Sequence, residues 1–200
     1  WFVLPIDLVG YAKLTTTNVS TTGTKTITMT PISNTAANVD RYPNGEGLRL
    51  FLASYSAMGA NAPTMQVTYT NSAGTTGRTT TSGCVSTASA TSGTILNSGN
   101  AANKYGPLAA GDTGVKDIES VIWGGTAHAS GSVFVGLCKP LCMPIPIPAT
   151  GLYNIMDFVN TVPSMPKLRN GANVTFLVFG TGATTAAGTV NANFDNGYGG

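Results

Sequence analysis

Hydrophobic and polar residues alternate along several short stretches of the chain, most clearly in residues 64–70, which read TMQVTYT. Met65, Val67 and Tyr69 fall on one face and polar side chains on the other, as in a strand that is buried on one side only. The next four residues, NSAG, tolerate positive φ angles, and residues 75–81 then return antiparallel. This segment therefore predicts a β-hairpin.

Three other stretches predict strands on the same grounds. Residues 24–31 alternate threonine with Ile27 and Met29, which indicates a half-buried strand. Residues 48–55 and 174–179 are short, nearly continuous apolar runs bounded by turn residues, as expected of strands that cross a core.

Two further predicted strands lie in the middle of the chain. Residues 115–122 carry apolar side chains on both faces and end at Gly124 and Gly125, and residues 132–137 form a short apolar run. We expect these two strands to pair as a hairpin in the middle of a sandwich. Four prolines between residues 140 and 148 remove N–H donors, so that segment predicts an extended strap at a sheet edge or rim.

The remaining segments are less regular. Residues 2–14 are apolar but interrupted by Pro5 and Gly10, which fits an opening edge strand or an arm that reaches a neighbouring subunit. The Ser/Thr/Ala/Gly tract of residues 82–98 predicts an exposed, weakly specified strand pair or a long loop. Residues 152–159 have helical spacing but are followed by prolines, so either one or two helical turns or an irregular extended arm is expected.

The fold class follows from this strand pattern. About seven or eight strands, with no helical stretch long enough to cross between parallel strands, predict antiparallel sheets. The 25 glycines, 11 prolines and many threonines and serines favour strands and turns. The sequence thus predicts a single all-β domain over residues 1–200, an antiparallel, jelly-roll-like β-sandwich. Residues 1–14 would form an N-terminal arm, the proline-rich segment a strap, and residues 181–200 a flexible or partner-pinned tail.

The small number of charged residues limits the classes of partner that the chain is expected to bind. Charged residues make up 9% of the chain and the formal net charge is +2, which gives neither a basic footprint for nucleic acid nor an acidic tail. No apolar stretch approaches the ~18 residues of a membrane helix, and the apolar first residues lack the basic region of a secretion signal. We expect no nucleic-acid or membrane partner. A weakly charged surface suits a protein packed against other proteins, or simply a threonine-rich sandwich.

Candidate catalytic residues are few. Asp117 and Glu119 stand two residues apart on a strand, where two carboxylates would share a face and could serve acid–base catalysis or calcium binding, but a solvated strand face has the same pattern. His128 with Ser130 lacks the G-x-S-x-G context of a nucleophile. We expect no catalytic residue and no enzymatic activity.

The three cysteines, Cys84, Cys138 and Cys142, cannot all pair within one chain, so free thiols are expected. Cys138 and Cys142 with His128 would make a zinc site only with a fourth ligand, which is missing. Buried small apolar side chains explain the cysteines better, and we expect no metal and no cofactor.

The aromatic residues are scattered, and two interpretations apply to them. They would either stack on sugars, as in a lectin-like sandwich, or pack in the core and in interfaces. The residues concerned are Tyr42, Tyr55, Tyr69, Tyr105, Trp123, Tyr153 and Tyr198.

Four phrases of the sequence carry a resemblance to a known family. They are VTYTNSAGTTGRT at residues 67–79, AAGDTGVKDIESVIW at 109–123, VFVGLCKPL at 133–141 before the strap, and LRNGANVTFLVFG at 168–180. In this order the chain, roughly from Leu48 to Gly180, resembles structural proteins of tailed-phage virions, in particular capsid decoration (cement) and minor capsid proteins, many of which are β-sandwiches. The resemblance implies a non-enzymatic protein that binds and stabilises the outside of an icosahedral shell, and it carries over no catalytic motif.

The resemblance also implies partners and contacts. The partner would be the major capsid protein, and the chain would act as a homo-oligomer, with a trimer favoured, on the capsid surface of a virion assembled in the host cytoplasm. Apolar arms and straps would complete a neighbour's sheet or groove. The candidate contact residues are Trp1, Phe2, Leu4, Ile6, Met143, Ile145, Ile147, Leu152, Ile155 and Phe158. Removal of residues 1–9 is expected to weaken binding and to leave the monomer folded.

Three alternatives to this function remain open at the level of sequence. The first is a receptor- or glycan-binding sandwich of a phage fibre or adhesin. The second is a glycan hydrolase that uses Asp117 and Glu119. The third is the principal shell subunit or part of a tail.

Overall fold

The computed structural model describes residues 2–31, 41–81, 84–85, 89–90, 92–93, 95–96, 105–142, 145–146 and 171–179. The strands are β1 (Phe2–Leu14), β2 (Gly23–Thr26), β3 (Thr30–Pro31), β4 (Arg49–Ser56), β5 (Thr64–Asn71), β6 (Arg78–Thr79), β7 (Cys84–Val85), β8 (Val115–Gly124), β9 (Ser132–Pro140), β10 (Ile145–Pro146) and β11 (Val174–Phe179). A short helix, α1 (Thr16–Val19), follows β1, and a 3-10 turn, η1 (Pro43–Gly45), precedes β4. The expectations for residues 152–159 and 181–200 lie outside the described residues.

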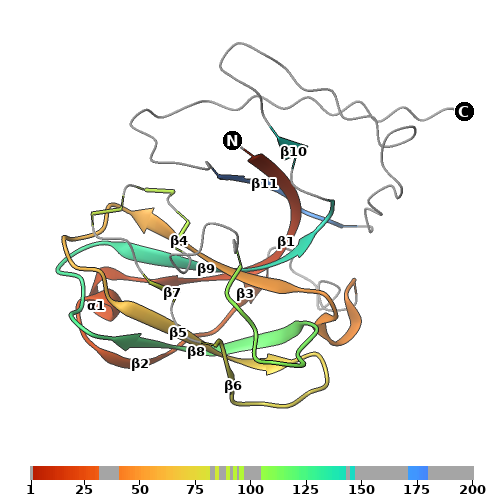
Figure 1. The fold of residues 1–200 in the computed structure, drawn as a ribbon, viewed down its shortest axis with the longest axis horizontal. Helices are drawn as coiled ribbons and strands as arrows, with labels where there is room; N and C mark the ends of the chain where they lie inside the picture. The colour runs from red at the N-terminus through yellow and green to blue at the C-terminus, as the bar shows by residue number, and fades with distance from the viewer. Residues whose placement is uncertain are drawn as a thin grey trace, which may run out of the picture.

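The strands form two antiparallel sheets (Figure 1). In the first, sheet A, the strand order is β10-β1-β9-β4, and β11 and β3 also pair with β1. In the second, sheet B, the order is β2-β8-β5-β6, and β7 pairs with β5. The two sheets pack face to face, so the predicted all-β antiparallel sandwich is confirmed. The jelly-roll topology is not confirmed by these strand orders.

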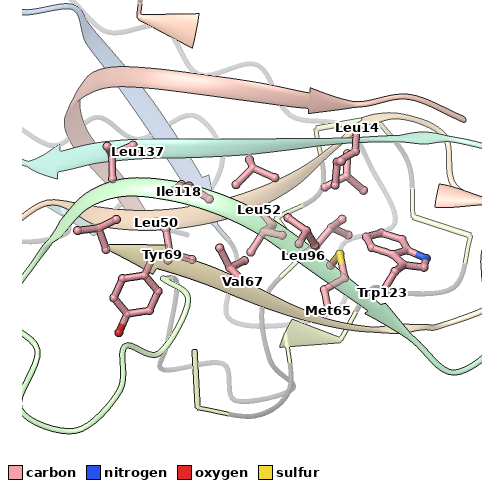
Figure 2. Packing of buried hydrophobic residues seen from close by; sticks show 14 of the residues in the cluster. Leu14, Leu50, Leu52, Met65, Val67, Tyr69, Leu96, Ile118, Trp123 and Leu137 are labelled. Atoms are coloured by element: carbon pink, nitrogen blue, oxygen red, sulfur yellow. The ribbon is translucent and has the colours of Figure 1, made fainter. Parts of the chain in front are cut away.

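A large cluster of buried apolar side chains fills the space between the sheets (Figure 2). Sheet A contributes Leu14, Leu50, Leu52, Val133, Val135 and Leu137, and sheet B contributes Met65, Val67, Tyr69, Ile118, Val121 and Trp123. The alternation that predicted β5 is confirmed, because Met65, Val67 and Tyr69 are buried while the residues between them are half-exposed. Each fully buried aliphatic side chain stabilises the fold by roughly 1.5–3 kcal/mol.

The predicted hairpin between residues 115–122 and 132–137 is wrong. Both strands exist, but β8 pairs with β5 and β2 in sheet B, whereas β9 pairs with β1 and β4 in sheet A. The connection between them is bound to a neighbouring loop, because Gly59 N donates to the Ser130 carbonyl at 3.1 Å and Asn61 Nδ2 to the Ala127 carbonyl at 2.7 Å. The chain therefore crosses between the sheets, and the apolar face of each strand reaches the shared core.

β8 also differs from its sequence pattern, which suggested apolar side chains on both faces. Val115, Ile118, Val121 and Trp123 are all buried in the core between the sheets. The pairing of β8 with β5 contains two register shifts, and each bulge exchanges the faces of the residues on either side of it. These four apolar residues are irregularly spaced in the sequence, but the two bulges bring them all to the face of β8 that meets the core.

Residues 2–14, which the sequence predicted to be an edge strand or an arm, form β1, and β1 lies inside sheet A. It pairs with β9 along one side and with β11 and β3 along the other. The strap closes the rim of the sheet, where Ile145 pairs with Val3. A register shift between Leu8 and Gly10 makes a bulge at Val9, which enters the core, while Leu4 and Ile6 belong to a second cluster.

Two other segments agree only in part with their sequence patterns. The predicted strand over residues 24–31 is divided between the sheets, because β2 pairs with β8 and β3 pairs with β1. Ile27 and Met29 lie between them and pack against the core. In the tract 82–98, expected to be exposed, Leu96 is fully buried.

Candidate interaction surface

The outer face of sheet A, opposite the core, carries a row of aromatic side chains. Across the sheet, Tyr11 pairs with Gly136, and Gly136 pairs with Phe51. The Phe134 ring stacks on Tyr11 with a centroid distance of 5.2 Å and an interplanar angle of 13°, and its centroid lies 5.8 Å from that of Phe51. Gly136 makes this row possible, because a Cβ at this position would collide with the Phe51 ring.

Tyr55 lies near the end of β4, on the same strand as Phe51, and its side chain is 55% exposed. A register shift between Ser54 and Ser56 places Tyr55 in a bulge, and bulges redirect side chains. Ser92 Oγ donates to the Tyr55 carbonyl at 2.8 Å, and the Lys13 ammonium lies 3.7 Å from the Tyr55 ring centroid in a cation–π contact. We call Tyr11, Lys13, Tyr55 and Phe134 the aromatic face; Phe51 is only 4% exposed and packs in a second apolar cluster beside it.

The contact residues predicted from the sequence lie beside this face or outside the described part of the chain. Leu4 and Ile6 are buried with Phe51 in the second apolar cluster, so in the monomer their side chains are already packed. Phe2 and Ile145 belong to the paired backbone of β1 and β10. The other predicted contact residues lie outside the described residues; they are Trp1, Met143, Ile147, Leu152, Ile155 and Phe158.

A buried ion pair, which the sequence did not indicate, holds the ends of sheet A together. The Asp7 carboxylate is fully buried and accepts hydrogen bonds from Arg41 Nε at 3.1 Å, Arg41 Nη2 at 3.2 Å and Tyr42 Oη at 2.9 Å. It also accepts one from the backbone N–H of Asn173 at 2.8 Å. One side chain of β1 therefore fixes residues 41–42 and the entrance to β11.

A second polar cluster, the Asp112 lock, joins the β5–β6 hairpin to the loop before β8. Asp112 Oδ2 accepts from Tyr69 Oη at 2.6 Å and from Arg78 Nε at 3.0 Å, and Oδ1 accepts from Asn71 Nδ2 at 2.7 Å. Burial alone would raise the pKa of Asp112, but the hydrogen bonds from Arg78, Tyr69 and Asn71 outweigh it and lower the pKa to about 2. Burial raises the pKa of Tyr69 to about 12, and its hydrogen bond to Asp112 adds to this.

The Asp112 lock gives a prediction about acid stability. Because the folded state lowers the pKa of Asp112 from 3.8 to about 2, its contribution is present above pH 4 and is lost as the pH falls from about 4 to about 2. Asp112→Asn offers one acceptor oxygen to three donors, and we expect it to lose about 1–3 kcal/mol at pH 7. Urea midpoints measured from pH 5 to pH 2 should fall more steeply in the wild type than in Asp112→Asn. The other carboxylates titrate in both proteins. If the two plots of urea midpoint against pH were parallel, Asp112 would not contribute to acid sensitivity.

Asp117 and Glu119, the pair considered for catalysis, have separate partners. Glu119 Oε1 accepts from Thr70 Oγ1 at 2.7 Å and from Gly77 N at 3.1 Å, and this places it between β5 and the hairpin turn. Asp117 is exposed and accepts from the backbone N–H of Ile118 at 2.9 Å. Within the part of the chain that the structure describes, no hydrogen bond joins the two side chains to a common group.

The histidine and the described cysteines belong to packed regions. His128 is fully buried, donates from Nδ1 to the Gly59 carbonyl at 3.2 Å and lies 6.0 Å from the Trp123 ring centroid, and burial lowers its pKa. Burial raises the pKa of the Cys138 and Cys142 thiols, which disfavours the reactive thiolate. Within the described ranges, no three His, Cys, Asp or Glu side chains lie close enough together to bind a metal ion.

The geometry defines an antiparallel β-sandwich with an aromatic outer face and two internal polar clusters. Comparison of the chain with protein families, with curated proteins and with solved structures gives no match. Among the helices that the structure describes, none combines the length and the apolar character needed to cross a membrane.

Proposed function

We propose that the chain is a structural protein of a phage virion that binds and stabilises an icosahedral capsid, as a decoration (cement) protein or a minor capsid subunit. The observation that carries this proposal is the Asp112 lock. Its donors Tyr69, Asn71 and Arg78 come from the phrase at residues 67–79, and Asp112 comes from the phrase at 109–123. Two phrases that carry the resemblance thus serve one structural purpose in this chain.

The described polar groups support a scaffold role. Asp7, Asp112 and Glu119 each accept hydrogen bonds from side chains or backbone that belong to other elements of the sandwich. Carboxylates used in this way stiffen the fold, and a shell-stabilising protein requires a stiff scaffold and no reaction centre. We accordingly propose a non-enzymatic role, with the major capsid protein as partner and a homo-oligomer, for which a trimer is the first expectation.

The glycan-binding alternative draws on the aromatic face. Sugars stack on flat, accessible rings. Here the Lys13 ammonium covers one side of the Tyr55 ring, and Tyr11 and Phe134 stack on each other. Because these ring faces are used within the chain, the geometry favours a protein partner over a sugar.

The proposed function is tested by co-sedimentation with capsids assembled from the major capsid protein encoded with this chain. We expect the chain to pellet with capsids in a saturable, stoichiometric manner, and imaging should locate it at fixed positions on the outer surface. A chain that stays in the supernatant at every capsid concentration would contradict the proposal. The position on the particle would also give the oligomer number.

A further inference from the structure

We infer that the aromatic face of sheet A is the surface through which the chain docks on a protein partner whose contact surface presents carboxylates among apolar side chains. The inference rests on the proposed function, in which this partner is the capsid shell. It differs from the sequence-based expectation, which placed the contacts on the N-terminal segment and the strap.

The aromatic face holds Tyr55, the most exposed large apolar side chain of the described residues. Among the described residues, the large apolar side chains that are exposed are Tyr55 at 55% and Val174 at 37%. Tyr55 is joined to the half-buried rings of Tyr11 and Phe134 through Lys13, which lies over the Tyr55 ring and pairs across the sheet with Phe134. Aromatic residues are enriched at the centres of protein interfaces, where they carry much of the binding energy.

The rings of this face are held in place before any partner arrives. The Phe51 and Phe134 rings fill the space beside Gly136, Tyr11 stacks on Phe134, and the bulge in β4 places Tyr55 beside Lys13. A surface ordered in advance loses little conformational entropy on binding, so a larger share of the contact energy appears as affinity.

Charge identifies the chemistry of the partner. Lys13 pairs across the sheet with Phe134, and Arg49 lies two residues before Phe51 on β4, so both cations belong to the side of sheet A opposite the inter-sheet core. The carboxylates of the described residues lie elsewhere, on Asp7, Glu46, Asp112, Asp117 and Glu119. A partner with complementary charge is therefore acidic, and electrostatic complementarity selects partner and orientation.

The same distribution argues against a second copy of the chain docked face to face. A two-fold contact brings the same patch of both subunits together, which would set Lys13 and Arg49 of one subunit against those of the other. Since the patch contains no carboxylate among the described residues, like charges would oppose each other. Contacts between copies would use a different surface.

The test measures capsid binding by the full chain and by variants of the aromatic face. We expect Tyr55→Ala and Lys13→Glu each to raise the Kd at least about tenfold, as truncation of an interface hot spot does. Tyr55→Phe, which keeps the ring, and Lys116→Glu, which makes the same charge change at an exposed position of β8, should bind like the wild type. Wild-type binding should weaken as NaCl rises from about 50 to 300 mM, and Lys13→Glu should lose this dependence.

The outcomes separate this inference from the proposed function. If the wild type pellets with capsids and both face variants pellet equally well, the inference is overturned and the proposed function stands. If the wild type does not pellet, both fail. Binding of the wild type to a glycan array that disappears in Tyr55→Ala would also overturn the protein-partner assignment. Thermal melts of each variant establish that the sandwich is intact, as the exposure of Tyr55 and Lys13 leads us to expect.

Discussion

Replacement of Asp7 by alanine is expected to lower the free energy of unfolding by about 3–5 kcal/mol. The carboxylate accepts four hydrogen bonds, two of them from Arg41, and both side chains are almost fully buried. Removing it takes this counter-charge from the buried Arg41 guanidinium, and takes this acceptor from the Asn173 N–H and the Tyr42 hydroxyl. Urea unfolding monitored by tryptophan fluorescence and by circular dichroism measures the loss.

A matched control is Asp117→Ala, which removes a carboxylate from an exposed position of β8. Among the described residues its side chain accepts one hydrogen bond, from the next residue, so we expect a change within about 0.5 kcal/mol. If Asp7→Ala lost no more stability than this control, the four hydrogen bonds at Asp7 would not stabilise the fold, and the role given to the buried ion pair of sheet A would be wrong.

Deletion of residues 1–9 is expected to abolish cooperative folding. Val3, Leu4, Ile6 and Val9 are buried, and at roughly 1.5–3 kcal/mol each their loss amounts to about 6–12 kcal/mol. Domains of this kind have a total stability of only about 5–15 kcal/mol. The deletion also removes Asp7 and the strand with which β11 pairs. This reverses the expectation from sequence, in which the segment was an arm and its removal left the monomer folded.

Far-UV circular dichroism and amide chemical-shift dispersion would detect the loss of fold. Leu4→Ala serves as the graded control, because a single truncation in the second cluster should cost about 2–5 kcal/mol and leave a folded chain. If the truncated chain unfolded cooperatively at the wild-type urea midpoint, residues 1–9 would not be needed for folding, and the sequence-based prediction of an arm would hold.

Local pattern was enough to predict most of the strands. β4, β5, β8, β9 and β11 fall where the apolar runs and the alternation placed them, because one face of each must reach the core. The turn before β6 was also predictable, since Asn71 and Gly74 suit a tight return of the chain. Strands and tight turns depend on residues that are close together in the sequence, so a single sequence is enough to predict them.

Pairing and the polar clusters were not predictable in the same way. The sequence predicted that β8 and β9 form a hairpin because they are consecutive. In the structure their connection crosses to the other sheet, and its carbonyls accept hydrogen bonds from residues 59 and 61. Asp7 and Arg41 stand 34 residues apart, and no spacing rule connects them. The aromatic face needs Tyr11, Gly136 and Phe51 in one row, which only the register of three strands reveals.

The pairing of β1 with β11 has a consequence for how the chain is made. Asp7 and its donor Asn173 are 166 residues apart, and at ribosomal rates of 5–20 residues per second roughly 8–33 s separate their synthesis. Throughout that interval the first strand has no β11 beside it, and its apolar residues are open to wrong pairing. Such late closure predicts slow folding and a need for chaperones during synthesis, and only a chain that has reached residue 179, the end of β11, can complete sheet A.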